Sequence, residues 1–597
     1  MFSVLKISGV RLKILPEHKT VDIIRNMQGE YMTEAGNNYS EKKTQLHISV
    51  RNLVEFIFRE GDIDNRSSRA MSADAMMEGT RIHRKIQGSM GKEYQAEVPL
   101  SLVVEGDLYE LTVEGRADGI FTEDGKCFVD EIKGMYRKVE LFEKPVFVHR
   151  AQAMCYAYIF ALQNNMETIG IQMTYCNLET EQTKYFREEF SFEEIKKWFD
   201  DLMEEYGKWA TFQCEMKNQR QASIKELDFP YEYRPGQKKL VSDVYRTIMR
   251  QKLLFMQAPT GVGKTISTIF PAVKAVGEEL ADRIFYLTAK TITATVAKET
   301  FALLEKNGYR AKTIQITAKE KLCPCDEMEC NPVTCPYAKG HFDRVNDAVF
   351  DLLHRCEMIE RDDILSQADR YTVCPFELCL DTASWCDNII CDYNYVFDPN
   401  VYLKRFFQEG IKGDYIFLID EAHNMVERSR QMYSAQIYKE DFLTVKRIMK
   451  EHSHSIEKAL EKCNKILLGM KRECENYTVY DTFGNMVFSF MRLMTLLDEF
   501  LQKANEFPGK KDVMDFYFEL RNFLNIYDLV DEHYVMYSEL EADGRFMLKL
   551  FCVDPSLNIQ KRLDKGKSAV FFSATFLPVN YYKSLISTKK RQLCHIC

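Results

Sequence analysis

The feature that most constrains this chain is a strand, a glycine-containing loop and a helix in direct succession. The apolar run Leu253 to Met256 leads into A-P-T-G-V-G-K-T, and a helix-compatible stretch follows. Glycines let such a loop turn its backbone N–H groups toward phosphate, while lysine reaches the β- and γ-phosphates and threonine ligates Mg²⁺. The pattern predicts a P-loop. Its expected nucleotide-binding residues are Ala258, Pro259, Thr260, Gly261, Val262, Gly263, Lys264 and Thr265, with Gln237 ahead of the loop as a candidate for reading adenine.

A second apolar strand, Tyr415 to Ile419, delivers the sequence D-E-A-H at its carboxyl end. Ligands of parallel α/β sheets bind at that end. We therefore expect Asp420 to hold Mg²⁺ through its hydration shell and Glu421 to orient or deprotonate the attacking water. Two more motifs follow strands, T-A-K-T at 288–291 and S-A-T at 573–575. They are expected to contact a DNA backbone or couple it to the nucleotide site; for each alone, a plain loop is the alternative.

Cysteine is unevenly distributed. Nine of the 18 cysteines fall between residues 323 and 391, in a chain with no evident export signal, which favours metal ligation over disulfides. Thiolates suit an iron–sulfur cluster or zinc, and spacing alone does not separate the two. The predicted ligands are Cys323, Cys330, Cys335 and Cys374, with Cys325 and Cys379 as alternatives for the first and last, and Cys356, Cys386 and Cys391 as unliganded cysteines.

The N-terminal third contains a second group of acidic and basic residues. Alternation along Cys127 to Lys133 places Glu131 and Lys133 on one face of a strand, and Asp118 lies near the turn that ends the preceding strand. Two carboxylates can bind Mg²⁺ or Mn²⁺, while a lysine positions water or balances charge on phosphate. The predicted set also includes His83, on a helical segment, and Gln152 and Tyr156, four apart on one helix face. The alternative is a solvated strand, because D…E-x-K patterns are short and arise by chance.

The motifs A-P-T-G-V-G-K-T, L-T-A-K-T, D-E-A-H and S-A-T, in this order, resemble the first RecA-like domain of the XPD/DinG group of superfamily 2 DNA helicases, over about residues 230 to 590. The resemblance implies ATP hydrolysis by Lys264, Thr265, Asp420 and Glu421, and 5′ to 3′ movement on DNA. It also implies a [4Fe–4S] domain between L-T-A-K-T and D-E-A-H, and a helical arch between D-E-A-H and S-A-T.

The set His83, Asp118, Glu131-x-Lys133 and Gln152-x-x-x-Tyr156 resembles the RecB-like branch of the PD-(D/E)xK nucleases, over about residues 47 to 210. That resemblance implies phosphodiester cleavage by Asp118, Glu131 and Lys133, with His83, Asp118 and Glu131 as ligands of Mg²⁺ or Mn²⁺.

The expected fold is α/β, a RecA-like P-loop parallel sheet preceded by an α/β restriction-endonuclease-like domain. The expected boundaries are 1–46 for an extension, 47–228 for the nuclease domain and 229–597 for the helicase domain, with insertions at 318–392 (Fe–S) and 424–550 (arch). Only 22 residues follow Thr575, whereas a second RecA-like domain needs on the order of 150. We therefore expect a truncated chain that lacks the second RecA-like domain and is deficient as a motor. Another polypeptide could supply the missing domain.

Composition limits the alternatives. A net charge of -9 and a pI near 5.8 exclude global attraction to nucleic acid but not a basic groove. No apolar stretch is long enough to span a bilayer, so we expect a cytoplasmic protein with no membrane partner. Single-stranded or forked DNA is the partner that the resemblances imply. The alternatives to a DNA-repair helicase with a nuclease domain are a non-motor module that binds ATP and DNA around a structural cluster, and a protein active only as a nuclease.

Overall fold

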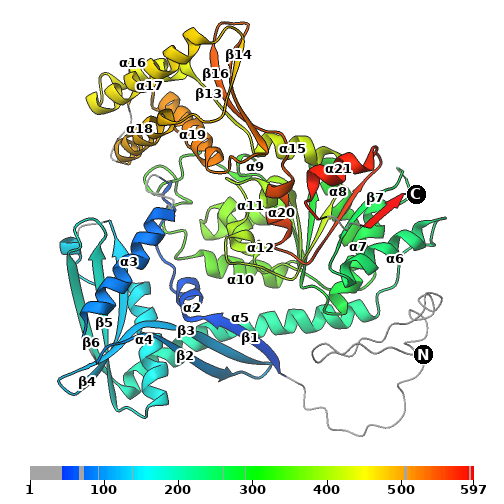
Figure 1. Cartoon of the computed structure of the whole chain (residues 1–597). Coiled ribbons are helices and arrows are strands. Elements are labelled where there is room, and N and C mark those ends of the chain that lie inside the picture. The colour runs from blue at the N-terminus through cyan, green and yellow to red at the C-terminus, as the bar shows by residue number, and fades with distance from the viewer. Residues whose placement is uncertain are drawn as a thin grey trace, which may run out of the picture.

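The computed structural model describes residues 43–65, 73–91, 93–136, 139–259, 261–289, 291–502, 504, 507–589 and 593–596. Most of the expected extension, residues 1–46, therefore lies outside the described residues. Three bodies follow one another along the chain: an N-terminal domain, a P-loop domain, and a helical domain inserted into the latter (Figure 1).

The N-terminal domain is built on a six-stranded sheet in the order β1-β3-β4-β5-β6, with β2 paired to β3. Its strands are β1 (Thr44–Ser49), β2 (Gln95–Glu105), β3 (Tyr109–Glu123), β4 (Lys126–Met135), β5 (Thr168–Asn177) and β6 (Thr183–Ser191). Its helices are α2 (Val50–Ile57), α3 (Ala73–Ser89), η2 (Val139–Leu141) and α4 (Phe147–Gln163). β4 and β5 are parallel and joined through α4, which packs on both. The Ser49 hydroxyl caps α2 by accepting from Asn52 N at 3.1 Å.

A single long helix, α5 (Phe192–Lys225), connects the two sheet domains. It begins at a capping box in which Ser191 and Glu194 satisfy each other's backbone N–H groups. Ile195 and Phe199 pack in the N-terminal core, whereas Trp209 and Phe212 pack in the core of the P-loop domain. The helix continues past Trp209 without a break, because its apolar stripe changes partners there rather than ending (Figure 1).

The P-loop domain contains an eight-stranded sheet in the order β10-β9-β11-β8-β12-β17-β7-β18, in which every pair of neighbours is parallel. Its strands are β7 (Leu253–Gln257), β8 (Arg283–Thr288), β9 (Thr313–Gln315), β10 (Met358–Ile359), β11 (Asn388–Asp392), β12 (Tyr415–Ile419), β17 (Ser568–Ser573) and β18 (Leu593–Ile596). Its helices are α6 (Gln237–Met249), α7 (Lys264–Gly277), α8 (Thr291–Lys306), α13 (Asn394–Phe397), α14 (Lys404–Phe407), η3 (Ala422–Asn424), α15 (Met425–Met432), α20 (Ser556–Leu563) and α21 (Val579–Ile586). The predicted α/β class with a parallel sheet is confirmed.

The cysteine-rich segment is smaller than the predicted insertion at 318–392. Its helices are α9 (Lys319–Leu322), α10 (Val345–Arg355), α11 (Arg361–Tyr371) and α12 (Pro375–Ala383). Within the same interval, however, β10 pairs with β9, and β11 lies between β9 and β8. β10 and β11 therefore belong to the main sheet, because their apolar residues complete it, and the predicted insertion at 318–392 stays a prediction.

The inserted helical domain lies between β12 and β17 and projects from the P-loop domain, at the top of Figure 1. Its helices are α16 (Lys439–Met449), α17 (His454–Glu473), α18 (Asn485–Leu501) and α19 (Lys510–Tyr527). The sequence predicts helices in 424–550, but the structure also has an antiparallel sheet there, in the order β13-β16-β15-β14. Its strands are β13 (Ala435–Tyr438), β14 (Tyr477–Tyr480), β15 (Tyr534–Leu540) and β16 (Phe546–Cys552). Across the described residues, no helix has the length and apolar character needed to cross a bilayer.

Candidate functional site

The four strands β8, β12, β17 and β7 are consecutive neighbours in the sheet, and each ends in one of the motifs singled out above. Because all are parallel, their carboxyl ends meet at one edge. The P-loop, D-E-A-H and S-A-T are thereby brought to a common site, although the first and last are separated by about half the chain.

The P-loop turns sharply between β7 and α7. Gly261 and Gly263 adopt φ of 85° and 81°, in the left-handed region that favours glycine. A side chain at Gly263 would also meet the Gln237 amide, 2.7 Å from the position of its Cβ. Lys264 begins α7 and donates through Nζ to the carbonyl of Ala258 at 3.2 Å. Thr260 and Lys290 lie outside the described residues.

Gln237 is buried behind this loop. Its amide nitrogen donates to Val262 O and Ser267 Oγ, both at 3.1 Å, and its Oε1 accepts from Arg234 N at 3.0 Å. These contacts give Gln237 a role in shaping the P-loop that the sequence did not suggest. Its reading of adenine stays a prediction.

Asp420 sits at the end of β12 with both carboxylate oxygens engaged. Oδ2 accepts from the Tyr286 hydroxyl at 2.6 Å, and Oδ1 from Glu421 N at 2.8 Å. The Tyr393 hydroxyl donates to the backbone carbonyl of Asp420. Burial raises the pKa of Asp420, and its hydrogen bonds oppose that rise. Tyr286 also contacts the side chain of Thr265, so one hydroxyl touches both residues expected to serve the Mg²⁺.

The acidic pair is linked to the S-A-T motif through His423. Glu421 has a φ of 47°, which turns the chain sharply after β12. His423 Nδ1 lies 3.2 Å from Glu421 Oε2 and 2.8 Å from Ser573 Oγ, and Ser573 Oγ accepts from Thr575 N at 3.1 Å. The site therefore has a direct route from the Glu421 carboxylate to a neighbouring strand end.

The second group of residues converges in the N-terminal domain on the adjacent strands β3 and β4. Lys133 Nζ lies 2.6 Å from Glu131 Oε1 and donates to Gln152 Oε1 at 3.3 Å. Asp118 Oδ2 accepts from Ile132 N at 2.7 Å. Glu131 is 1% exposed, and its Oε2 is buried without a hydrogen-bond partner. Burial raises the pKa of Glu131 to about 8, against the opposing effect of Lys133.

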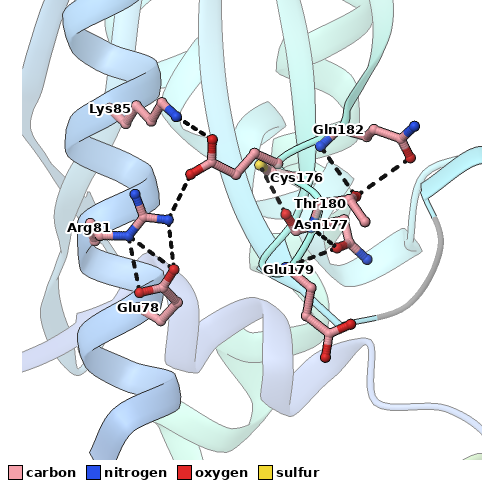
Figure 2. Close-up of polar contacts among 9 residues, drawn as sticks. Glu78, Arg81, Lys85, Cys176, Asn177, Glu179, Thr180 and Gln182 are labelled. Atoms are coloured by element: carbon pink, nitrogen blue, oxygen red, sulfur yellow. Dashed lines mark hydrogen bonds and ion pairs between the residues drawn. The ribbon is translucent and has the colours of Figure 1, made fainter.

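His83 reaches this site from α3, with Nδ1 3.5 Å from Asp118 Oδ1. Burial acts to lower the pKa of His83, but Asp118 raises it overall. Figure 2 shows how α3 is held: Arg81 bonds Glu78 at 2.7 Å and Glu181 at 2.8 Å, and Lys85 also pairs with Glu181. The Glu78 pair lies within α3. Because Glu181 belongs to the turn between β5 and β6, its ion pairs with Arg81 and Lys85 fix α3 to the sheet.

Tyr156 and His149 complete the surroundings. Tyr156 packs so closely on β3 that a Cβ at Gly115 would lie 2.5 Å from its hydroxyl oxygen. Burial raises the pKa of Tyr156 to about 12. His149, which the sequence did not single out, lies 3.2 Å through Nδ1 from the Tyr175 hydroxyl, and burial with nearby Lys133 lowers its pKa to about 4. The predicted His83, Asp118, Glu131, Lys133, Gln152 and Tyr156 thus occupy one site.

The four predicted cysteine ligands line a single small cavity, together with Ile63, Lys319, Pro324, Tyr337, Ala338, Pro375 and Phe376. Burial raises the pKa of Cys374 to about 11. The alternative first ligand, Cys325, is adjacent, with its Sγ 3.8 Å from that of Cys335. Cys379 is buried and does not line the cavity; its Sγ lies 4.0 Å from the Gln315 carbonyl. The cavity therefore favours Cys374 over Cys379, and its thiols fit an iron–sulfur cluster or zinc.

Within the described ranges, no group of three or more His, Cys, Asp or Glu side chains is arranged to hold a metal ion as the side chains stand. At the N-terminal site, Lys133 pairs with one oxygen of Glu131 and leaves the other unpartnered. An unpartnered buried carboxylate oxygen is an unusual cost to stability, which a bound cation would relieve. The chemistry of this donor set fits Mg²⁺ or Mn²⁺.

Residues 304–442 match the family model DEAD_2, an interval that includes the cysteine cavity and Asp420 but neither Lys264 nor the N-terminal domain. The chain is 24% identical over 232 residues to the General transcription and DNA repair factor IIH helicase subunit XPD/RAD3 of Saccharomyces cerevisiae, covering 33% of this chain and 29% of that protein. It is 20% identical over 248 residues to Regulator of telomere elongation helicase 1 of Rattus norvegicus, covering 33% and 19%. The matched parts thus span less than a third of either relative.

Two solved structures are also similar. One, titled XPD_Helicase, is 16% identical with a TM-score of 0.38, covering 61% of this chain and 62% of that chain. The other, titled Truncated XPD, is 16% identical with a TM-score of 0.39, covering 60% and 99%.

Proposed function

We propose that this chain is an ATP-dependent DNA helicase of the XPD type, with a metal-dependent DNA nuclease domain at its N-terminal side, and that it acts in DNA repair or processing. The observation that carries the motor half is the adjacency of β8, β12, β17 and β7, which gathers four sequence-distant motifs at one sheet edge. The match of residues 304–442 to DEAD_2 supports the same assignment.

In the proposed ATP site, Lys264 and the P-loop backbone bind the β- and γ-phosphates. Thr265 and Asp420 would hold Mg²⁺, which neutralises charge on the phosphates when bound. Tyr286 fixes the Asp420 carboxylate, since its hydroxyl donates to Oδ2. Glu421 orients the attacking water and accepts its proton.

Coupling to DNA is assigned to the strand ends beside the ATP site. His423 contacts both Glu421 and Ser573. A shift of the S-A-T segment on DNA binding would therefore move His423 and, through it, Glu421, the residue proposed to accept the proton of the attacking water. A 5′ to 3′ polarity follows from the resemblance to XPD and DinG helicases.

The nuclease half rests on the unpartnered oxygen of Glu131 beside Asp118 and Lys133. Glu131, Asp118 and His83 would hold Mg²⁺ or Mn²⁺, which activates water when bound. Lys133 balances charge on the scissile phosphate, and Gln152 orients the lysine by accepting from it. The cysteine cavity is assigned to a [4Fe–4S] cluster on Cys323, Cys330, Cys335 and Cys374.

The primary test is ATP hydrolysis by the whole chain, purified without oxygen, with and without single-stranded DNA. Stimulation by DNA that is lost in Lys264→Ala but kept in Lys239→Ala, an exposed lysine on α6, would support a motor. ATP binding without any stimulation by DNA would instead favour a non-motor module in which the nucleotide is regulatory.

A further inference from the structure

The segment Arg59–Asn65, which leaves α2 of the N-terminal domain, lies against the cysteine-bearing segment nearly 300 residues later in the chain. Two of its backbone N–H groups donate across the contact, Ile63 N to Ala338 O and Asn65 N to Cys330 O, both at 2.9 Å. In return, Phe342 N donates to Gly61 O at 3.0 Å. This is a strand-like exchange of main-chain hydrogen bonds, and one acceptor is itself a predicted cluster ligand.

Side chains extend the same contact on both sides. Asp62 Oδ1 accepts from Gly340 N at 2.6 Å, and Asp343 Oδ1 accepts from Gly61 N at 2.7 Å. At the start of the segment, Arg59 donates to Asp381 Oδ2 at 2.9 Å and to Asn346 Oδ1 at 2.8 Å. Both Asp381 and the Arg59 guanidinium are largely removed from solvent, so this pair is not a loose surface contact.

The decisive residue is Ile63, because its side chain lines the cavity that Cys323, Cys330, Cys335 and Cys374 share. The cysteine-bearing segment therefore does not enclose its own cavity. One wall comes from the N-terminal domain.

We infer that the segment Arg59–Asn65 is a protective wall of the cluster site, so that the N-terminal domain shields the thiolate-bound cluster from water and oxidants. This inference rests on the proposed [4Fe–4S] cluster. The apolar shell around a metal site controls solvent access and hence the persistence and potential of the group inside it. Ile63 and Asp62 act here as positioning residues, since Ile63 has no atom that can ligate iron and Asp62 lies outside the cavity lining, where its carboxylate accepts from Gly340 N.

The test compares variants of the whole chain, isolated and reconstituted without oxygen, by their iron and sulfide content and by the loss of visible cluster absorbance after air is admitted. Ile63→Ala removes most of the wall side chain. Its matched control is Val333→Ala, which shortens a 79% exposed residue between two of the predicted ligands and outside the cavity lining. We expect Ile63→Ala to lose its absorbance about tenfold faster than wild type, with Val333→Ala unchanged.

Asp62→Ala provides a second route that leaves the cavity lining intact and removes only the acceptor for Gly340 N. Its control, Asp543→Ala, removes an acceptor for Arg545 N in the turn between β15 and β16. Asp62→Ala should lose its cluster absorbance about threefold faster than wild type, because the segment Arg59–Asn65 opens more often when one of its hydrogen bonds is lost. Equal bleaching rates in wild type, Ile63→Ala and Asp62→Ala, at equal starting iron content, would overturn the inference.

Hydrogen exchange gives a readout independent of colour. The amides of Ile63 and Asn65 should exchange more slowly in cluster-loaded protein than in protein whose cluster has been removed. If wild type takes up no iron at all, the cluster assignment itself fails, and this is known before any variant is compared.

Discussion

The two carboxylate sites of this chain contain similar residues but differ in how their carboxylate oxygens are partnered. Each combines two acidic residues with a lysine: Asp420, Glu421 and Lys264 follow the ends of β12 and β7, whereas Asp118, Glu131 and Lys133 lie within β3 and β4. At the first, both oxygens of Asp420 are hydrogen-bonded, and Lys264 is held by a backbone carbonyl. At the second, lysine and Glu131 pair directly, and one buried carboxylate oxygen has no partner.

This difference determines whether the orientation of each carboxylate depends on a bound cation. At the P-loop site, the Tyr286 hydroxyl and the Glu421 N–H fix the Asp420 carboxylate, so it keeps its orientation whether or not a cation is near. At the N-terminal site, Glu131 is held only by its ion pair with Lys133, so its geometry depends on what balances the Glu131 charge. Preorganised dipoles favour catalysis without rearrangement, whereas a charge-balanced site changes with pH and with metal.

The largest expected effect separates the two sites by their lysines. Lys264→Ala should lower ATP hydrolysis by at least about a hundredfold and leave metal-dependent DNA cleavage intact, while Lys133→Ala should do the reverse. Both rates are measured on each purified variant. Lys126→Ala, on the same strand as Lys133 but exposed, is the control. Loss of both activities in either variant would mean that the sites are not independent.

The role of the tyrosine hydroxyl is tested by Tyr286→Phe. Without the hydrogen bond to Asp420, the carboxylate loses its fixed orientation, and ATP hydrolysis should fall about tenfold with little change in the concentration of ATP needed for half-maximal rate. Tyr309→Phe, which removes a buried hydroxyl near Asn388, should behave as wild type. An unchanged rate of ATP hydrolysis in Tyr286→Phe would show that the Tyr286 hydroxyl is not needed to orient the Asp420 carboxylate.

The charge dependence of the N-terminal site is tested by Glu131→Gln in metal-free protein. The pKa of Glu131 is raised by burial to about 8 in the folded chain, from an ordinary value of 4.5. Between these two values the folded state holds a proton that the unfolded state releases, so the contribution of Glu131 to stability is fully present below pH 4.5 and is lost as pH rises through about 8.

Because glutamine cannot ionise, stability should decline less with rising pH in Glu131→Gln than in wild type. Between pH 5 and pH 8, the Tm of wild type should fall by roughly 2 °C more than that of Glu131→Gln, as measured by thermal unfolding with a chelator present. Glu189→Gln, at an exposed position on β6, should follow wild type. If the Tm of wild type and of Glu131→Gln changed with pH in parallel, the raised pKa of Glu131 would be contradicted.

The smallest expected effect concerns coupling. Ser573→Ala removes the contact with His423, so stimulation of ATP hydrolysis by single-stranded DNA should fall about fivefold while the rate without DNA stays close to wild type. Ser568→Ala, at the other end of β17, is the control. A loss of the DNA-independent rate in Ser573→Ala would place the serine in the chemistry rather than in coupling.

The sequence predicts the local parts of both sites well, because each motif is contiguous. A P-loop after a strand, or carboxylates at a strand end, follows from residue order alone. Tyr286 could not be predicted in the same way, since a side chain in the middle of an apolar strand gains its role only when the order β11-β8-β12 sets its neighbour. Tyr393, in the turn after β11, and His149, half-buried on α4, are similar cases.

Longer-range features were predicted less well for a related reason. The short strands β13 and β14 are four residues each, too brief to separate from helical sequence by periodicity. β10 and β11 complete the main sheet from inside the cysteine-rich interval, which no local signal reveals. The wall that Arg59–Asn65 forms depends entirely on how two distant segments meet.

Helix α5 has one more consequence. At about 1.5 Å per residue, its 34 residues give a continuous rod of roughly 50 Å that is anchored in both cores. Its two ends cannot turn independently without breaking the rod, so the N-terminal core and the P-loop core keep a set separation. Under the proposed function, a DNA strand moved by the motor would reach the N-terminal carboxylates after a constant number of nucleotides, and α5 would act as a ruler for the cleavage products.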